Sequence, residues 1–249
     1  MKPFSYSDYE SRLMDNEYIR MLQRPRVRFF KSCRKVLDLA CGSGIFLELL
    51  KEAGIEAVGV DRNKDIVEKA RLKDLKVAQS DIFDYLEKAA EEYDGIFCSH
   101  FLEHIAFDRV VRLIELIAKR LVPGGVLVFV LPNPGSIRLH LFGFWRDPEH
   151  VRFYTGNLIA SVCQHYGLSV GYSNEEETPN LLETPRLDPI SARPSVSSWK
   201  GFWKENRAEI LLLEWNRKIE EFNQRMEKFS EAVNKMWARD DEVVLVCRK

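Results

Sequence analysis

The stretch Val36-Leu-Asp-Leu-Ala-Cys-Gly-Ser-Gly-Ile-Phe46 is the most informative segment of this 249-residue chain. An apolar run stops at a glycine-rich turn and restarts with helical spacing, which predicts a strand, a tight turn and a helix. Gly42 and Gly44 carry no Cβ atom, so a ligand can lie against the backbone of the turn and the first amides of the helix. The next apolar segment, Ala57–Val60, ends at Asp61, where a carboxylate is placed to accept both hydroxyls of a ribose. The sequence therefore predicts a nucleoside-binding site.

The spacing of the glycines argues against a dinucleotide. The dinucleotide fingerprint has three glycines in G-x-G-x-x-G, and the third position is Leu47 in this chain. Asp38, inside the first predicted strand, would repel a phosphate group and suits a ligand that carries an ammonium group.

At this point the residues resemble the class I S-adenosylmethionine (SAM)-dependent methyltransferases, whose first motif is acid-x-Gly-x-Gly-x-Gly. Ala40 stands where the family more often has its first glycine. Three further segments follow in the family's order: Ala78–Ile82, Tyr93–His104 and Leu121–Asn133. The resemblance covers roughly residues 33–173 and implies SAM as cofactor and S-adenosyl-L-homocysteine as product.

The cofactor contacts expected on this resemblance are Asp38, Ala40, Gly42, Gly44, Asp61, Arg62, Asp81, Ile82, Ser99 and His100. Asp61 and Asp81 have an alternative role as helix N-caps, because a helical pattern follows each of them. Capping and ligand contact are compatible, since both take place at the end of a strand.

A narrower group is similar in Leu47–Asp61, Asp84–Glu87, Asp147–Arg152 and Asp241–Lys249. It comprises methyltransferases associated with surface-polysaccharide and O-antigen biosynthesis and, more loosely, the ubiquinone-pathway O-methyltransferases. The group often carries Arg-Gly-Ser in its N-terminal lid, whereas this chain has Met14-Asp-Asn16 there. The resemblance implies O-methylation of a hydroxyl on a saccharide or small metabolite. An N- or S-methyltransferase of a small molecule or protein, and a non-catalytic SAM-binding partner protein, stay open as alternatives.

The loop after the fifth predicted strand should lie at the ligand-binding edge of the sheet. Its aromatic and charged residues suit a hydroxylated or anionic acceptor, and we expect acceptor contacts from Trp145, Asp147, Arg152 and Tyr154. The alternative is that Asp147 starts a turn and Tyr154 packs. A sugar hydroxyl also needs a base, and the candidate catalytic residues are His104 and His150.

We expect no metal ion. His100 and His104 are four residues apart, but the glutamate is at the wrong place for H-E-x-x-H. A weaker divalent site that uses Glu103 and a histidine stays open.

The composition limits the partners. Thirty-seven Lys and Arg nearly balance 38 Asp and Glu, so we expect no nucleic-acid binding. The five cysteines are scattered without a C-x-x-C pair, and no apolar segment predicts a membrane span. These features predict a cytoplasmic protein.

The alternation of strand and helix patterns predicts an α/β fold with a Rossmann-like, doubly wound, mostly parallel seven-stranded sheet. Among the predicted elements are a helix over 63–70 and strands over 75–79 and 125–131. The predicted organisation is a helical lid over 1–32, a SAM-binding core over 33–173, a Pro-rich loop over 174–203, a long amphipathic helix over 204–240 inserted before the last strand, and that strand over 241–249.

Apolar residues recur in steps of four and three from Ala208 to Met236 in the inserted helix. Such a stripe must be covered, either by the parent domain or by the same helix of a second chain. The second case would make a homodimer through residues 208–236.

Overall fold

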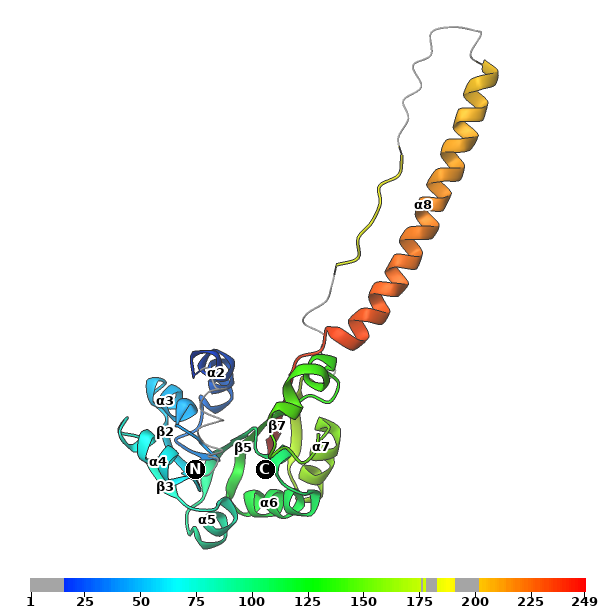
Figure 1. Cartoon of the computed structure of the whole chain (residues 1–249). Helices are drawn as coiled ribbons and strands as arrows, with labels where there is room; N and C mark the ends of the chain where they lie inside the picture. Colours follow the sequence, from blue (N-terminus) through cyan, green and yellow to red (C-terminus); the bar gives the residue numbers. More distant parts are fainter. Residues whose placement is uncertain (1–15, 176, 178–182, 191–201) are drawn as a thin grey trace. The chain divides into compact units, whose positions relative to one another are not determined.

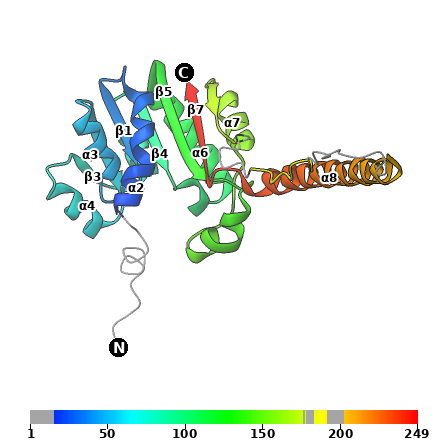
Figure 2. The ribbon, with the colours of Figure 1, turned by 90° about the horizontal axis from the view of Figure 1, so that it is seen from above.

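The computed structural model describes residues 16–175, 177, 183–190 and 202–249. Its central sheet has seven strands in the order β3-β2-β1-β4-β5-β7-β6. They are β1 Lys35–Leu39, β2 Glu56–Asp61, β3 Val77–Gln79, β4 Tyr93–Ser99, β5 Leu121–Pro132, β6 Ser169–Ser173 and β7 Glu242–Arg248. β1 to β5 pair in parallel, and β7 runs antiparallel to both β5 and β6. Figure 2 shows β1, β4, β5 and β7 side by side. The predicted doubly wound, mostly parallel sheet is confirmed.

Helices cover both faces of this sheet. They are α2 Asn16–Gln23, α3 Ile45–Glu52, α4 Lys64–Arg71, α5 Ile82–Lys88, α6 Phe107–Arg120 and α7 Gly156–His165. Apolar side chains of α5, α6 and α7 form one buried cluster with the strands, and those of α3 and the segment around Phe30 form another on the opposite face. In Figure 1, α5 and α6 lie on the other side of the sheet from α2 and α3. No helix in the described ranges is both long and apolar enough to cross a membrane.

Three element boundaries differ from those predicted. The N-cap of α4 is Asn63, whose side chain accepts from the amides of Asp65 and Ile66, so the expectation that Asp61 caps this helix is wrong. β5 begins at Leu121, because its first residue pairs with Tyr93 across a register shift before the glycine turn. β3 begins only at Val77.

The N-terminal segment continues from α2 into a 3-10 helix, η1 Arg24–Phe30. Pro25 lies in its first turn and has no amide hydrogen to donate to an α-helical ladder. The Met14-Asp-Asn16 stretch, apart from Asn16, and the rest of the predicted lid before it lie outside the described residues.

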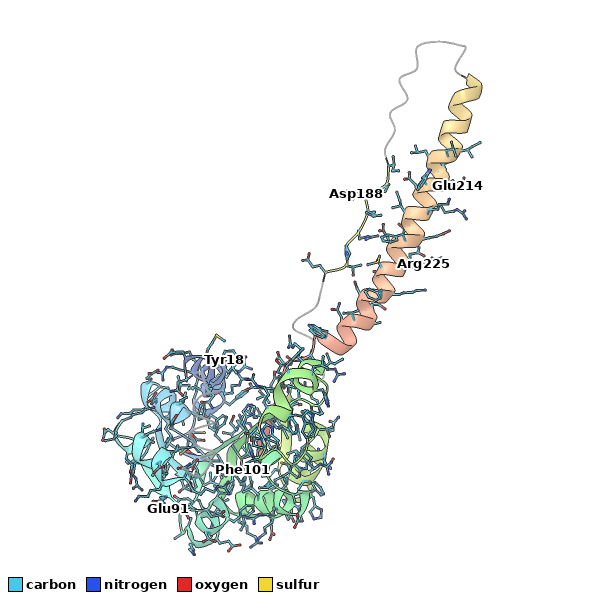
Figure 3. The ribbon with its side chains drawn as sticks, viewed as in Figure 1. Tyr18, Glu91, Phe101, Asp188, Glu214 and Arg225 are labelled. Carbon is cyan, nitrogen blue, oxygen red and sulfur yellow. The ribbon has the colours of Figure 1, made fainter. Side chains whose placement is uncertain are left out.

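The chain divides into two compact units, residues 1–177 with 240–249, and residues 178–239. The second contains the long helix α8 Phe202–Trp237 and an extended segment over 183–190. Figure 3 labels Asp188 on that segment and Glu214 and Arg225 on α8. The positions of the two units relative to one another are not determined.

Two asparagines of α8 bind the extended segment through its backbone. Asn223 accepts from the amide of Leu187 at 2.9 Å and donates to its carbonyl at 3.0 Å. Asn216 makes the same pair of bonds with Ile190, at 2.8 and 3.2 Å. Part of the helix is thus covered by a neighbouring segment of its own unit, a cover that the apolar pattern did not predict.

Candidate active site

The glycine-rich turn after β1 is shaped by three residues with positive φ, Ala40 at 55°, Gly42 at 53° and Gly44 at 81°. A Cβ atom on Gly42 would meet nothing within 4 Å, so the space beside this backbone is open. A Cβ atom on Gly44 would lie 2.5 Å from Leu75 Cδ1, so this glycine is needed for packing. The turn therefore offers a ligand a bare backbone surface at Gly42.

Asp61 holds this turn in place from the end of β2. Its Oδ2 accepts from the Gly42 amide at 3.0 Å, and its Oδ1 accepts from the Asn63 amide at 2.8 Å. An ionised carboxylate has about four acceptor positions, so Asp61 keeps capacity for the hydroxyls of a ribose.

Asp38 is a buried acid with an unused oxygen. Its side chain is 3% exposed, and its Oδ2 has no hydrogen-bond partner among the described residues. Burial raises the pKa of Asp38 well above its usual range, and the negative charge of Asp61 adds to this effect. A buried oxygen without a partner costs about 1–3 kcal/mol, which a ligand with an ammonium group would recover. Asp38, the turn at Gly42 and Asp61 lie at the ends of β1 and β2, and we refer to this set as the crevice. Its unpaired buried oxygen and bare backbone fit SAM.

Asp81 begins α5, where its Oδ1 accepts from the amides of Phe83 and Asp84 at 2.8 and 3.4 Å. Its predicted role as an N-cap is confirmed. The side chain is also exposed at the same edge of the sheet as Asp61, and Ile82 beside it is buried. The cofactor contact expected from Asp81 and Ile82 stays a prediction.

A row of charged groups runs from the end of β4 to η1. Glu103 Oε1 lies 3.1 Å from His100 Nδ1, and Glu242 Oε1 lies 2.8 Å from His100 Nε2. Glu242 Oε2 in turn accepts from Arg26 at 2.5 Å. Burial lowers the pKa of His100, but the hydrogen bonds and charges of the two glutamates outweigh it and raise the pKa to about 10. Both ring nitrogens of His100 are thus engaged, its amide donates to the Val130 carbonyl at 2.9 Å, and the cofactor contact expected from Ser99 and His100 stays a prediction.

The two candidate bases lie next to each other. The backbone carbonyl of Glu103 accepts from the Val151 amide at 2.8 Å, which fastens the loop after β5 to the loop after β4. As a result, the rings of His104 and His150 are 4.7 Å apart between centroids. Figure 3 labels Phe101, which lies in the loop after β4.

The surroundings of His104 and His150 differ. His150 Nδ1 lies 2.6 Å from the carbonyl oxygen of Phe144. Because a carbonyl can only accept, Nδ1 carries a proton, and Nε2, on the other side of the ring, lies 3.8 Å from Asp147 Oδ2. Burial lowers the pKa of His104 below its usual range, and the nearby His150 adds to this effect, so His104 stays neutral near pH 7.

The predicted acceptor contacts have different surroundings. Trp145 is 64% exposed, and the Arg152 guanidinium lies 5.0 Å from the centre of the Tyr154 ring. Asp147 accepts from the Glu149 amide at 2.8 Å and so forms a turn. Tyr154 is 2% exposed, and its hydroxyl donates to the Ile105 carbonyl at 2.8 Å. The structure therefore favours the packing alternative for Tyr154 and shows the turn at Asp147.

Several residues at this edge of the sheet were missed. Glu149 lies 3.4 Å from Arg62, so the loop after β5 reaches the predicted cofactor residues at the end of β2. The ring of Phe144 stacks on that of Phe153 at 3.6 Å and orients His150 through its carbonyl. Only the density of aromatic residues between 142 and 154 signals these contacts in the sequence.

Comparison with known proteins extends this description. Residues 8–172 match the model of the family described as "Methyltransferase domain". The ubiquinone biosynthesis O-methyltransferase of Aliivibrio fischeri (strain MJ11) is 34% identical over 115 residues, which are 44% of this chain and 48% of that protein. The chain thus spans about half the length of the curated relatives it matches.

Two solved structures resemble the chain to different extents. A SAM-dependent methyltransferase from Archaeoglobus fulgidus is 27% identical, with a TM-score of 0.71, and the match covers 99% of this chain and 100% of that one. An O-methyltransferase family protein from Burkholderia thailandensis shares the fold at 19% identity and a TM-score of 0.51, over 63% of this chain and 54% of that one. The chain belongs to the methyltransferase domain family, and the predicted class, that of the class I SAM-dependent methyltransferases, is confirmed.

Proposed function

We propose that this protein transfers a methyl group from SAM to a hydroxyl oxygen of a small acceptor, in the first place a saccharide or a small metabolite. The observation that carries the proposal is that β1 holds an unpartnered buried oxygen, Asp38 Oδ2, and is followed by a turn with open space at the bare backbone of Gly42. The name of the Aliivibrio fischeri relative, an O-methyltransferase, supports oxygen as the methylated atom. The saccharide rests on the sequence resemblance alone.

The residues of the crevice would hold SAM by its three polar parts. Asp38 suits the ammonium group, Asp61 the ribose hydroxyls, and the strand end at Asp81 the adenine. When bound, SAM would supply an electrophilic methyl group, which the acceptor oxygen attacks in line with the S–C bond, so that S-adenosyl-L-homocysteine leaves. A fixed alignment of the oxygen with the methyl group supplies much of the acceleration.

His150 is the residue best placed to take the hydroxyl proton. Its Nδ1–H is fixed by the Phe144 carbonyl, so its Nε2 is the accepting atom. His104, 4.7 Å away between ring centres and neutral at pH 7, is the second candidate. A neutral imidazole positioned in this way accelerates proton removal by about 10²–10⁴-fold.

Two measurements test the proposal. Isothermal titration with SAM measures binding, and transfer of a radiolabelled methyl group to panels of hydroxyl, amine and thiol acceptors measures turnover. Labelling of amines or thiols alone would replace the proposal by an N- or S-methyltransferase. Binding of SAM without labelling of any acceptor would favour a non-catalytic SAM-binding partner.

Replacement of Asp61 by Ala is the matching site test. We expect SAM affinity to fall about tenfold or more, because the ribose contacts and the tether of the Gly42 amide are lost together. Asp84→Ala, at an exposed position in the first turn of α5, serves as the control and should leave affinity unchanged. Unchanged affinity in the Asp61 variant would show that the site is wrongly assigned.

We also propose that the protein is a cytoplasmic homodimer that associates through α8. Three aromatic side chains with seven-residue spacing, Trp215, Phe222 and Phe229, are 57%, 45% and 62% exposed on this helix. The extended segment at Leu187 and Ile190 binds the adjacent stripe of the helix and leaves these rings uncovered. The five free cysteines suit a reducing compartment.

A further inference from the structure

Glu103, His104 and His150 form a compact group of potential metal ligands. One ligand atom from each residue lies within 4.8 Å of the other two. The residues come from two loops, which the bond from the Val151 amide to the Glu103 carbonyl holds together.

Only one oxygen of the Glu103 carboxylate has a hydrogen-bond partner among the described residues, and that bond orients the group. Its side chain is 1% exposed, and Oε1 is bonded to His100 Nδ1 at 3.1 Å. Oε2 is buried and has no hydrogen-bond partner in the part of the chain that the structure describes. A buried carboxylate oxygen is costly unless a cation or a donor meets it.

His150 has the arrangement of a metal-bound histidine. Its Nδ1–H donates to the Phe144 carbonyl at 2.6 Å, which leaves Nε2, 3.8 Å from Asp147 Oδ2, as the ring nitrogen that can bind a metal. Histidines that bind metals usually donate the other ring N–H to a carbonyl or carboxylate in this way, and their carboxylate neighbours are also hydrogen-bonded. The bond between Glu103 and His100 meets the second condition.

We propose that Glu103 Oε2, His104 and His150 Nε2 bind one divalent first-row transition-metal ion. Two imidazoles and one carboxylate are a donor set that suits Zn²⁺ and Fe²⁺. Ligands at about 2.0–2.2 Å from an ion lie about 3–3.5 Å from one another, so the two histidines, which are only partly buried, would move inward. Three protein ligands leave at least one position open.

The open position would bind the oxygen of the methyl acceptor. This role rests on the proposed function, whereas the binding of the ion does not. A bound hydroxyl would be both oriented toward the crevice and made more acidic. The histidines would then act as ligands and not as the base.

The test is a titration of the full-length protein, freed of metal with a chelator, with Zn²⁺ alone. Isothermal titration gives the affinity and the number of ions, and the visible absorption of Co²⁺ reports the type of ligand in a parallel titration. The variants are Glu103→Gln, His104→Ala and His150→Ala. His165→Ala, on the exposed end of α7, is the matched control.

We expect one tightly bound ion in the wild type and in the His165 variant. Each of the three ligand variants should bind Zn²⁺ at least about tenfold more weakly. Glu103→Gln keeps the size and the bond to His100, so it answers the question even if a histidine variant fails to fold in circular dichroism. Equal Zn²⁺ affinity in the wild type and in Glu103→Gln, or no Zn²⁺ binding by a folded wild type, would overturn the site.

A SAM titration on the same preparations separates the two proposals. If the wild type binds SAM and methylates an acceptor without binding Zn²⁺, only the metal site fails. If Zn²⁺ binds as expected and SAM does not, the metal site stands and the proposed function fails.

Discussion

Asp61 and Asp38 differ in the hydrogen bonds that the protein itself supplies to their carboxylates. Both oxygens of Asp61 accept from backbone amides, so this residue shapes the turn before any ligand binds. Asp38 is buried deeper in β1 with an oxygen that nothing in the described chain satisfies. Asp61 thus preorganises the site, and Asp38 keeps an unpaired oxygen for the ligand.

The raised pKa of Asp38 makes SAM binding depend on pH. The ammonium group is attracted by the ionised carboxyl, and burial holds the pKa of Asp38 well above the usual value. We therefore expect SAM affinity, measured by titration calorimetry, to rise as the pH increases from about 4 toward this raised pKa. Asp38→Asn should bind SAM more weakly and without this slope. An equal slope in both proteins would assign the titration to another group.

The same residue has an opposite effect on stability. Because the folded-state pKa is raised, the protonated acid favours folding below the usual pKa, and this contribution is lost as the pH rises through the raised value. Asp38→Asn should therefore gain melting temperature relative to the wild type as the pH increases. Thermal melts across a pH series measure the difference.

Tyr154 provides a test of packing against acceptor binding. Removal of its hydroxyl in Tyr154→Phe breaks the bond to the Ile105 carbonyl and should lower the free energy of unfolding by about 0.5–1.5 kcal/mol. The KM for the acceptor should stay within about twofold, since the ring is buried. A tenfold increase in KM with no loss of stability would return Tyr154 to the acceptor pocket. Urea unfolding and steady-state kinetics give the two values.

At the scale of the elements, α8 is a helix that binds an extended segment by its backbone. Asn216 and Asn223 are two helical turns apart and each satisfies both the amide and the carbonyl of one residue. Backbone recognition of this kind depends little on the side chains of the bound segment. The spacing of the two asparagines sets which residues of the extended segment lie beside which turn of the helix.

The double variant Asn216→Ala/Asn223→Ala should release this segment. Trypsin would then cut after Arg186 at least about tenfold faster, because local unfolding would no longer have to break four hydrogen bonds. Gln224→Ala, at an exposed position next to Asn223, is the control and should be cut at the wild-type rate. Equal rates in all three proteins would mean that the bonds do not hold the segment.

The local signals in the sequence predicted the elements around the crevice. Gly42, Gly44 and Asp61 follow from strand, turn and helix patterns that lie within one βαβ unit. The contact between His104 and His150 depends on two loops meeting, and the bond from Arg26 to Glu242 joins residues 216 positions apart. Neither of these contacts produces a periodic pattern in the sequence. The two asparagines of α8 were not singled out from the sequence, because no sequence pattern reveals a backbone partner.

At the scale of the whole molecule, the proposed dimer predicts a change of mass. Light scattering coupled to size-exclusion chromatography should give twice the chain mass of 29.0 kDa for the wild type. Replacement of Trp215, Phe222 and Phe229 by Ser should give the monomer with unchanged SAM affinity, since these rings lie in the second unit. Leu213→Ser, an exposed apolar residue off this spacing, is the control. A monomeric wild type would rule out the dimer.

The order of the strands has a consequence for synthesis on the ribosome. β6 pairs with β7 alone among the described strands, and β7 also supplies Glu242, which stands between His100 and Arg26. A nascent chain that stops before residue 242 could assemble β1 to β5, with β5 as the open edge of the sheet and β6 still without its partner strand. The crevice for the nucleoside can therefore form early in translation, whereas the charge balance around His100 is completed only when the polypeptide after α8 has emerged.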